Sequence, residues 1–183
     1  MAGPPAQDPA LSGPGEVELV ERARKGDLAA FASLVHAHEA KLRRYTRRLA
    51  GDDGDDIAQE SLLAAWRALS QWRGEGSFAA WLRTIATRRF LDRSRSALGR
   101  AQFVPMETVA EHGCHRGPEQ RVTIDRALAT LAPRERVAAL LVFSEGHSHV
   151  EAAAILGLPL GTLKSLVSRA RAALIPLLEG SQA

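Results

Sequence analysis

A chain of 183 residues, 45% of them hydrophobic, can bury one modest core or two small ones, and its clusters of proline and glycine favour two. Its net charge of +3 permits nucleic-acid binding without requiring it. The single cysteine, Cys114, excludes an internal disulfide framework and fits a reducing cytoplasm. No apolar run approaches the roughly 20 residues that a membrane span needs, and no signal peptide is recognisable. We therefore expect a soluble, intracellular protein without a membrane span of its own.

The N-terminal part of the chain predicts a short tail and two helices. Residues 1–15 are rich in proline and small residues, which predicts a disordered tail without a functional site. A short amphipathic helix follows from residue 16 and ends at Gly26, and Asp27 is placed to cap a longer helix. The outer face of the longer helix is basic, which we interpret as solvation of Lys41, Arg43, Arg44, Arg47 and Arg48.

An acidic segment, residues 51–56, separates this helix from the next. Clustered carboxylates can bind a hard cation. However, Asp55 or Asp56 sits where a helix N-cap belongs, and the helix dipole favours carboxylates there without an ion, so we predict no metal site. One side of the following helix mixes charge with apolar groups, which suits docking to a protein, although solvation is the simpler alternative. That side carries Asp56, Gln59, Glu60, Leu63 and Arg67, with Trp66 at its border.

A flexible break at residues 73–76 leads into a third strong helix. Ser77 can cap this helix, which is predicted to run from Phe78 to about Ser94. We expect the aromatic side chains of Phe78 and Trp81 to lie in the core. Another side of the helix combines threonines with arginines, which suits backbone phosphates and unstacked bases. These residues are Thr84, Thr87, Arg88 and Arg95, with Leu91 among them.

Residues 96–118 lose helical periodicity, and their glycines and prolines predict a flexible linker between two helical domains. His112, Cys114 and His115 lie in it but fall short of the usual four zinc ligands, so we predict no metal and no cofactor. The second domain opens at about Glu119. Its expected core residues, ahead of residue 144, are Val122, Ile124, Leu128, Leu131, Val137, Leu140, Leu141 and Phe143.

Residues 144–178 have the pattern of a helix-turn-helix. Ser148 and Glu151 form a capping-box pair at the start of the first helix. Gly157 can end that helix in the left-handed conformation, and Pro159 precedes the second helix. The apolar stripe of the second helix consists of Leu160, Leu163, Val167, Ala170, Leu174 and Leu177. Its other face is small, polar and cationic, which suits the major groove of DNA, although a helical hairpin with a solvated face is the alternative.

Together these patterns resemble the compact bacterial sigma factors of the extracytoplasmic-function (ECF) type. In the first domain the matching residues are Asp56-Ile57-Ala58-Gln59-Glu60, Trp66, Phe78, Trp81-Leu82, Ile85-Ala86, Asp92-Arg93 and Arg95. In the second they are Leu131, Pro133, Arg136, Glu145-Gly146, Glu151, Ala153, Ile155-Leu156-Gly157, Gly161-Thr162-Leu163-Lys164-Ser165 and Arg169-Ala170-Arg171. The resemblance implies an all-α fold of two small helical domains. A sigma region 2-like domain would cover residues 16–95 and a sigma region 4-like domain residues 119–183, joined by the linker of residues 96–118.

The resemblance also implies a function, that of a subunit which binds core RNA polymerase and directs promoter-specific initiation without a catalytic residue. The core-binding surface, docking on the clamp helices of the β′ subunit, would be Asp56, Gln59, Glu60 and Leu63. The unpaired minus-10 strand would be held by Arg73, Ser77, Thr84, Thr87, Arg88 and Arg95, and the duplex minus-35 element by Thr162, Lys164, Ser165, Ser168 and Arg169. Such proteins are commonly inhibited by an anti-sigma factor, which implies that partner here and, where the partner is membrane-bound, a place at the inner membrane.

Several positions depart from the residues usual in the family, and three of them bear on base preference. Arg88 stands where Asn is usual, Leu166 where Arg is usual, and Ser168 where His is frequent, so the base preferences of the family are not carried over. Leu166, at the edge of the apolar stripe, is a candidate for an unusual DNA contact or for a contact with a partner protein. Two other functions stay open. A stand-alone helix-turn-helix regulator would use only residues 119–183, and an enzyme would bind a divalent metal at the acidic segment.

Overall fold

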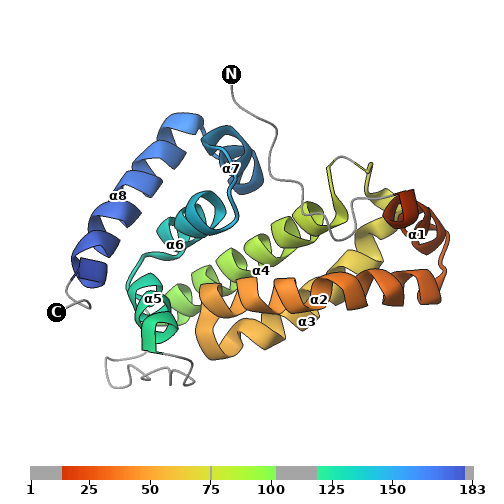
Figure 1. The fold of residues 1–183 in the computed structure, drawn as a ribbon, viewed down its shortest axis with the longest axis horizontal. Helices are drawn as coiled ribbons and strands as arrows, with labels where there is room; N and C mark the ends of the chain where they lie inside the picture. Colours follow the sequence, from red (N-terminus) through yellow and green to blue (C-terminus); the bar gives the residue numbers. More distant parts are fainter. Residues whose placement is uncertain (1–13, 75, 102–118, 180–183) are drawn as a thin grey trace.

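A computed structural model describes residues 14–74, 76–101 and 119–179, and this part of the chain consists of helices and their connections without a strand. The all-α fold expected from the sequence is confirmed. The helices are α1 (Pro14–Arg24), α2 (Leu28–Ala50), α3 (Gly54–Ala68), α4 (Phe78–Ala101), α5 (Glu119–Ala129), α6 (Pro133–Ala139), α7 (His149–Leu156) and α8 (Leu160–Glu179), as Figure 1 shows. Short 3₁₀ turns cover Gly51–Asp53 and Leu69–Gln71, and a π-helical turn covers Leu140–Ser144.

The first four helices share one core around α2. Asp27 caps α2 as expected, because its carboxylate accepts the N–H groups of Ala29 and Ala30 at 2.9 and 3.1 Å. Gly51 ends α2 with a positive φ of 59°, a conformation that glycine adopts without strain. The fully buried side chains that these helices contribute include Leu34, Leu49, Ile57, Leu69, Phe78 and Leu82.

The acidic segment differs from the expectation, because α3 begins at Gly54 and Asp53 is its N-cap, so the helix starts at least two residues earlier than an N-cap at Asp55 or Asp56 would place it. Asp55 instead pairs with α2, at 2.7 Å from Arg47 and 3.2 Å from Arg43. The hydrogen bond from Arg47, and then that from Arg43, lowers the pKa of the Asp55 carboxyl. Two of the cations expected to be solvated are therefore engaged in ion pairs that connect α2 to α3.

The last four helices pack around α6 and α8, with Leu131, Val137, Leu141, Leu163 and Ala170 buried. Two residues expected in this core are exposed, Ile124 at 45% and Phe143 at 54%. Phe143 lies within the π-helical turn. Such a turn has an extra residue, which shifts the Phe143 side chain out of the register expected for an α-helix. For Ile124, helix α5 uses its C-terminal residues Ala127 and Leu128 for packing instead.

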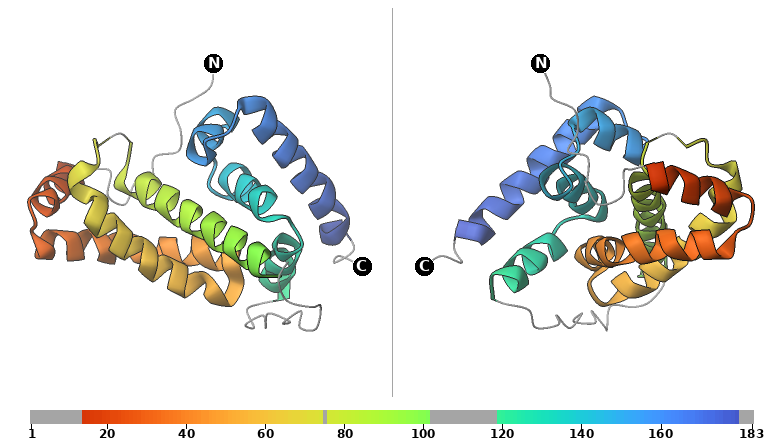
Figure 2. Two further views of the ribbon diagram at one scale, coloured as in Figure 1. Left: turned by 180° about the vertical axis from the view of Figure 1, so that it is seen from behind. Right: turned by 45° about the vertical axis from the view of Figure 1, so that its right-hand side comes forward.

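The two groups of helices pack against each other. In both views α6 and α7 lie beside α4, and α5 lies near the C-terminal end of α2 (Figures 1 and 2). Helix α4 continues through Ala101, beyond the predicted end near Ser94, so it enters the segment expected to be a linker. His112, Cys114 and His115 lie outside the described residues, and the division into domains at residues 15, 95 and 118 stays a prediction.

Arg136 of α6 is the central polar contact between the two groups. Its guanidinium donates to the Leu49 carbonyl at the end of α2 at 2.5 Å and to the Ala129 carbonyl of α5 at 2.6 Å. It also lies over the ring of Phe90 of α4, 5.8 Å from the ring centre. Burial lowers the pKa of Arg136, as expected for a cation removed from water. One side chain therefore joins α2, α4, α5 and α6.

Two further polar contacts cross the same junction. Arg83 of α4 lies 3.0 Å from the Glu145 carboxylate, and their side chains are only 20% and 22% exposed. Arg48 of α2 donates to the hydroxyl of Ser144 at 2.6 Å. Both partners of these arginines belong to the segment that connects α6 to α7, so this connection is fixed against the first four helices.

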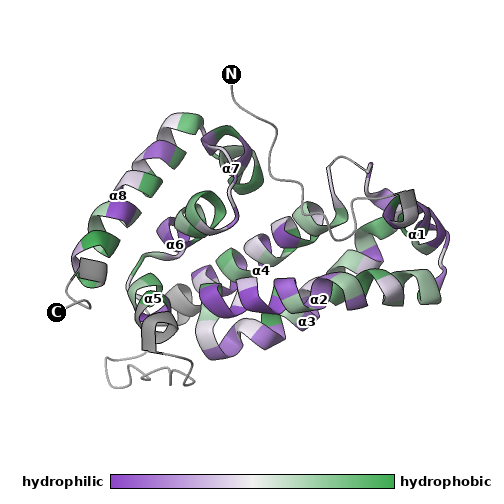
Figure 3. Cartoon of the chain, in the orientation of Figure 1, coloured by the Kyte–Doolittle hydropathy of each residue, from purple (hydrophilic) through white to green (hydrophobic). Residues whose placement is uncertain are grey.

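Within the described residues no single helix is long and apolar enough to cross a membrane. Helices α7 and α8 meet the criteria of length and composition only when taken together, and the chain bends by 104° between them. Hydrophilic and hydrophobic residues alternate along α8 (Figure 3).

Gly54 allows a close approach of the backbones of α2 and α3. A Cβ atom there would lie 2.5 Å from the Cα of Arg47 and 2.8 Å from the carbonyl carbon of Thr46. Because both neighbours are backbone atoms, the Gly54→Ala variant should force the helices apart and lower the free energy of unfolding by about 1–3 kcal/mol. Urea denaturation would measure this loss. Gly161→Ala is the matched control, since a Cβ there meets nothing within 4 Å and should leave stability unchanged or slightly raised.

Candidate nucleic-acid and docking surfaces

The exposed face of α3 combines acidic side chains with an apolar one. All four predicted docking residues, Asp56, Gln59, Glu60 and Leu63, are exposed, and their spacing places them on one side of the helix within about two turns. Leu63 is 54% exposed. The structure thus brings together an apolar side chain and a surrounding acidic rim, as expected for a surface that binds a protein.

Arginines of α4 lie near this face but do not form hydrogen-bonded ion pairs with its carboxylates. Arg93 is 3.9 Å from Asp56 and 3.7 Å from Glu60, and Arg89 is 4.0 Å from Glu60. These separations exceed hydrogen-bond length, and exposed pairs of this kind contribute little to stability. The two carboxylates are therefore available to cations of a partner. Trp66 borders the face as predicted, partly buried with its ring 4.9 Å from that of Phe31.

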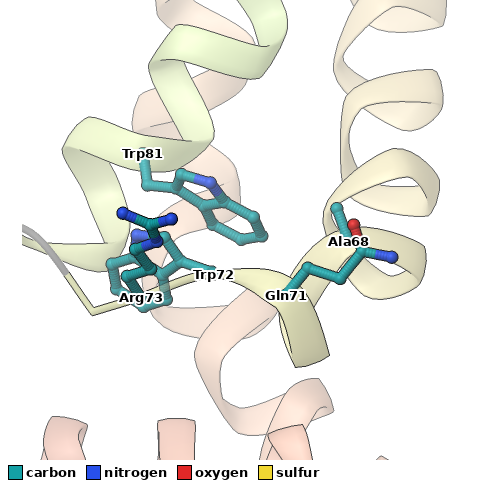
Figure 4. A pocket seen from close by; sticks show the side chains of 5 residues that line it. All are labelled: Ala68, Gln71, Trp72, Arg73 and Trp81. Atoms are coloured by element: carbon teal, nitrogen blue, oxygen red, sulfur yellow. The ribbon is translucent and has the colours of Figure 1, made fainter.

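An open pocket of about 340 Å³ lies where the segment after α3 meets the start of α4. Its lining residues are Ala68, Gln71, Trp72, Arg73 and Trp81 (Figure 4). The rings of Trp72 and Trp81 are stacked, with centres 4.9 Å apart and planes 15° from parallel. Trp81 packs against the core as expected, but it is only partly buried and its open side lines the pocket. The sequence analysis did not predict this pocket, although two tryptophans on either side of a glycine-rich break are a signal that could have indicated it.

The predicted side of α4 presents cations further along the helix than the pocket. Arg88 and Arg95 are exposed, and Thr84 is partly buried with its hydroxyl donating to the Ala80 carbonyl at 3.0 Å. Arg95 pairs with Asp92, whereas Arg88 makes no ion pair within the described part of the chain. Ser77 caps α4 as expected, because its hydroxyl accepts the Ala80 N–H at 3.2 Å. The arginine guanidiniums are the groups on this side that remain accessible to phosphate.

Thr87 does not belong to this surface, contrary to the expectation. Its side chain is fully buried, and its hydroxyl lies 2.7 Å from that of Tyr45. Helical spacing places Thr87 on the same side of α4 as Arg83 and Phe90, which contact the second group of helices. Burial raises the pKa of Tyr45, so this phenol stays protonated and can donate to Thr87.

The turn between α7 and α8 has the geometry that the sequence predicted. The Ser148 hydroxyl accepts the Glu151 N–H at 3.2 Å, and the Glu151 carboxylate accepts the Ser148 N–H at 2.8 Å. These bonds form a complete capping box and lower the pKa of Glu151. Gly157 ends α7 in the left-handed conformation, with φ 63° and ψ 38°. The local sequence alone therefore fixes where α7 starts and ends.

The outward face of α8 carries all the residues predicted to read duplex DNA. Thr162, Lys164, Ser165, Ser168 and Arg169 are exposed, on the side opposite the buried Leu163, Val167 and Ala170. Arg169 donates to the Glu135 carboxylate of α6 at 2.7 Å, which holds the guanidinium over one edge of this face. Leu166 is only 6% exposed, so its proposed role as an edge contact to DNA is contradicted. The ends of the apolar stripe, Leu160 and Leu177, are partly open at 39% and 43%.

The described residues contain no group of three or more His, Cys, Asp or Glu side chains that could hold a metal ion.

Comparisons with known proteins match these same segments. Residues 34–99 match the family described as Sigma-70 region 2, and residues 121–174 match Sigma-70, region 4. The chain is 32% identical over 166 residues to the ECF RNA polymerase sigma factor SigM of Mycobacterium tuberculosis, covering 89% of this chain and 84% of SigM. It is 30% identical over 172 residues to the ECF RNA polymerase sigma-E factor of Salmonella typhimurium, covering 85% of this chain and 90% of that protein.

Two solved structures have a similar fold. The sigma factor RpoE of Bartonella quintana, in complex with the anti-sigma factor NepR, is 31% identical with a TM-score of 0.65, covering 81% of this chain and 96% of RpoE. CnrH, in complex with the cytosolic domain of CnrY, is 28% identical with a TM-score of 0.62, covering 91% of this chain and 98% of CnrH.

The capping box at the start of α7 gives a test of the local structure. Ser148→Ala removes the hydroxyl that accepts the Glu151 N–H and should lower the free energy of unfolding by about 1 kcal/mol. Urea denaturation at neutral pH would measure it. Ser165→Ala is the matched control, because its exposed hydroxyl donates only to the Gly161 carbonyl within α8. An equal loss in both variants would contradict the cap.

Proposed function

The chain belongs to the ECF RNA polymerase sigma factors, and we propose that its three exposed surfaces divide the work of promoter recognition. The face of α3 binds core polymerase, the pocket and the exposed arginines of α4 hold the unpaired minus-10 strand, and α8 reads the minus-35 duplex. The observation that supports this division best is that each of the two family matches contains an accessible face whose chemistry suits its task.

The proposed core-binding surface is formed by Asp56, Gln59, Glu60 and Leu63, which dock on the clamp helices of the β′ subunit. An exposed leucine within an acidic rim provides an anchor that gains by desolvation and charges that steer a basic partner. The long pairs with Arg89 and Arg93 cost little to exchange for contacts with the polymerase.

The proposed minus-10 site combines stacking with phosphate contacts. Opening a duplex costs base stacking, and a protein compensates by holding exposed bases on aromatic side chains and the backbone on cations. The pocket beside Trp72 and Trp81 offers the aromatic surface, and Arg73 lines it. Arg88 and Arg95 supply cations along α4. Ser77 lies at the start of this helix, and Thr84 lies between Ser77 and Arg88 on the same side. Thr87 is left out of this site because it is buried.

The proposed minus-35 reader is the outward face of α8. Small hydroxyl side chains at Thr162, Ser165 and Ser168 allow close approach to base edges. Lys164 and Arg169 supply the positive charge that binds phosphates. Gly157 forms the turn between α7 and α8, and α8 packs on α6 and α7, so this face is formed before DNA arrives.

Regulation by an anti-sigma factor is part of the proposal, because the similar RpoE structure is a complex with such a protein. An inhibitor that covers the α3 face or α8 would block polymerase or promoter binding. We place the protein in the cytoplasm, and at the inner membrane where its inhibitor is anchored there. As a member of a family of non-enzymatic initiation factors, it should carry no catalytic activity of its own.

Transcription in vitro tests the whole proposal. The chain, added to core polymerase on a library of randomised promoters, should yield transcripts from a subset with shared minus-35 and minus-10 sequences. Failure to associate with core enzyme would refute it. Tight, specific DNA binding by the chain without polymerase would instead favour the stand-alone regulator.

Leu63→Asp tests the α3 face. The variant replaces the apolar anchor by a charge and should weaken binding to core polymerase at least tenfold, that is, by about 1.4 kcal/mol or more. Titration of fluorescently labelled protein with core enzyme would measure it. Leu28→Asp is the matched control, since Leu28 is 66% exposed but lies at the start of α2. Equal effects of the two substitutions would show that the α3 face is not the docking surface.

Lys164→Ala tests the α8 face. Removal of one phosphate contact should reduce the slope of log affinity against log salt by about 1. The affinity of the holoenzyme for the selected promoters, measured across a series of KCl concentrations, gives this slope. Arg126→Ala, which removes an exposed cation of α5, should leave it unchanged. An unchanged slope for Lys164→Ala would place its ammonium away from phosphate.

A further inference from the structure

A buried carboxylate from α1 reaches the start of α4. Glu16 is only 8% exposed, and one of its oxygens accepts the backbone N–H of Phe78 at 3.3 Å. Phe78 is the first residue of α4, where backbone N–H groups have no partner within the helix. Glu16 therefore provides, from 62 residues away in the sequence, a cap that the local chain supplies only in part through Ser77.

The same carboxylate connects to α2. Its second oxygen lies 3.5 Å from Nε2 of His38, which is itself buried, and the His38 ring is 5.5 Å from that of Phe78. Burial of an acid is unfavourable unless hydrogen bonds and charges compensate it. The partners of Glu16 on α2 and α4 provide that compensation, so three helices meet at one carboxylate.

This contact lies directly behind the aromatic pocket. The ring of Phe78 is 5.8 Å from that of Trp81 and 6.1 Å from that of Trp72. Phe78 itself is 1% exposed and does not line the pocket. Phe78 thus sets the position of both stacked tryptophans. Its backbone places Trp81 through the first turn of α4, and its ring packs against the ring of Trp72.

The segment before Phe78 cannot set this position alone. Gly74 and Gly76 both have positive φ, 76° and 78°, and a Cβ at either would meet nothing within 4 Å. Unpacked glycines leave the backbone many conformations, so the start of α4 needs a fixed contact elsewhere. The N–H of Phe78, held by Glu16, is such a contact.

We propose that Glu16, from a helix outside the segment that matches Sigma-70 region 2, is a positioning residue for the pocket that holds the unpaired minus-10 strand. The proposal rests on the proposed function of that pocket. It assigns α1 a part in promoter opening that needs no contact between α1 and DNA. Docking of α1 is a separate property, which Val20 and Ala23 provide through their buried side chains.

The pocket can be tested first without polymerase or DNA. The chain has three tryptophans, so Trp66→Phe leaves Trp72 and Trp81 as the only indole reporters. In this background Glu16→Ala should shift the emission maximum of the folded protein and raise the Stern–Volmer constant for acrylamide quenching about twofold or more. Glu16→Gln keeps an oxygen that can accept the Phe78 N–H and should restore the parent spectrum. Val20→Ala, which loosens α1 without removing the carboxylate, should not change it.

The functional test uses the holoenzyme on a promoter selected from the library. Glu16→Ala should lower permanganate reactivity of minus-10 thymines about tenfold, with core affinity and minus-35 binding unchanged within twofold, and Glu16→Gln should recover most of the signal. Normal opening by Glu16→Ala, or an equal loss with Val20→Ala, would overturn the proposal. A Gln variant as weak as the Ala variant would also overturn it. If the proposed function itself is wrong, the unaltered holoenzyme will open no promoter. That outcome differs from every result that overturns the Glu16 proposal alone.

Discussion

The guanidinium of Arg136 is the interaction on which the arrangement of the whole chain depends. A half-buried cation needs acceptors in place of water, and Arg136 takes acceptors from α2 and α5 while lying against the ring of Phe90 on α4. The halves of the molecule are therefore joined by shared polar groups as well as by apolar packing. This junction also explains why one side of α4 faces protein and only the other is left for nucleic acid.

The two proposed DNA-binding surfaces solve different physical problems. Helix α8 presents a preformed face, since its start is fixed by a glycine turn and its buried stripe packs on α6. A preformed face suits a duplex, whose shape is already regular. In the proposed function the aromatic pocket instead receives a base that has left its stack, and two glycines with positive φ lie beside the pocket. In our proposal the pocket is held in position by Phe78, which packs behind it, and by the Glu16 carboxylate that accepts the Phe78 N–H.

Features set by local sequence could be predicted, and features set by packing between distant segments could not. The capping box at Ser148 and the helix end at Gly157 follow from a few neighbouring residues, and both were correct. Thr87 was misplaced because periodicity cannot tell which of two polar sides of α4 meets Tyr45. Phe143 was misplaced because a π-helical turn breaks the 3.6-residue period on which the prediction relied. The role of Asp55 required knowledge of how α2 and α3 pair.

The bend between α7 and α8 has a consequence for promoter architecture. Gly157 ends α7 in the left-handed conformation, the chain bends by 104° between α7 and α8, and α8 packs on both α6 and α7, so these three helices form one packed unit. Each base pair added between the two promoter elements rotates the minus-35 groove by about 35° around the duplex axis. Under the proposed function, the packing within α6–α8 stays the same while the groove rotates. The range of accepted spacer lengths would then be set by how this unit is connected to the first four helices and by how far the DNA twists, and not by the helix that reads the bases.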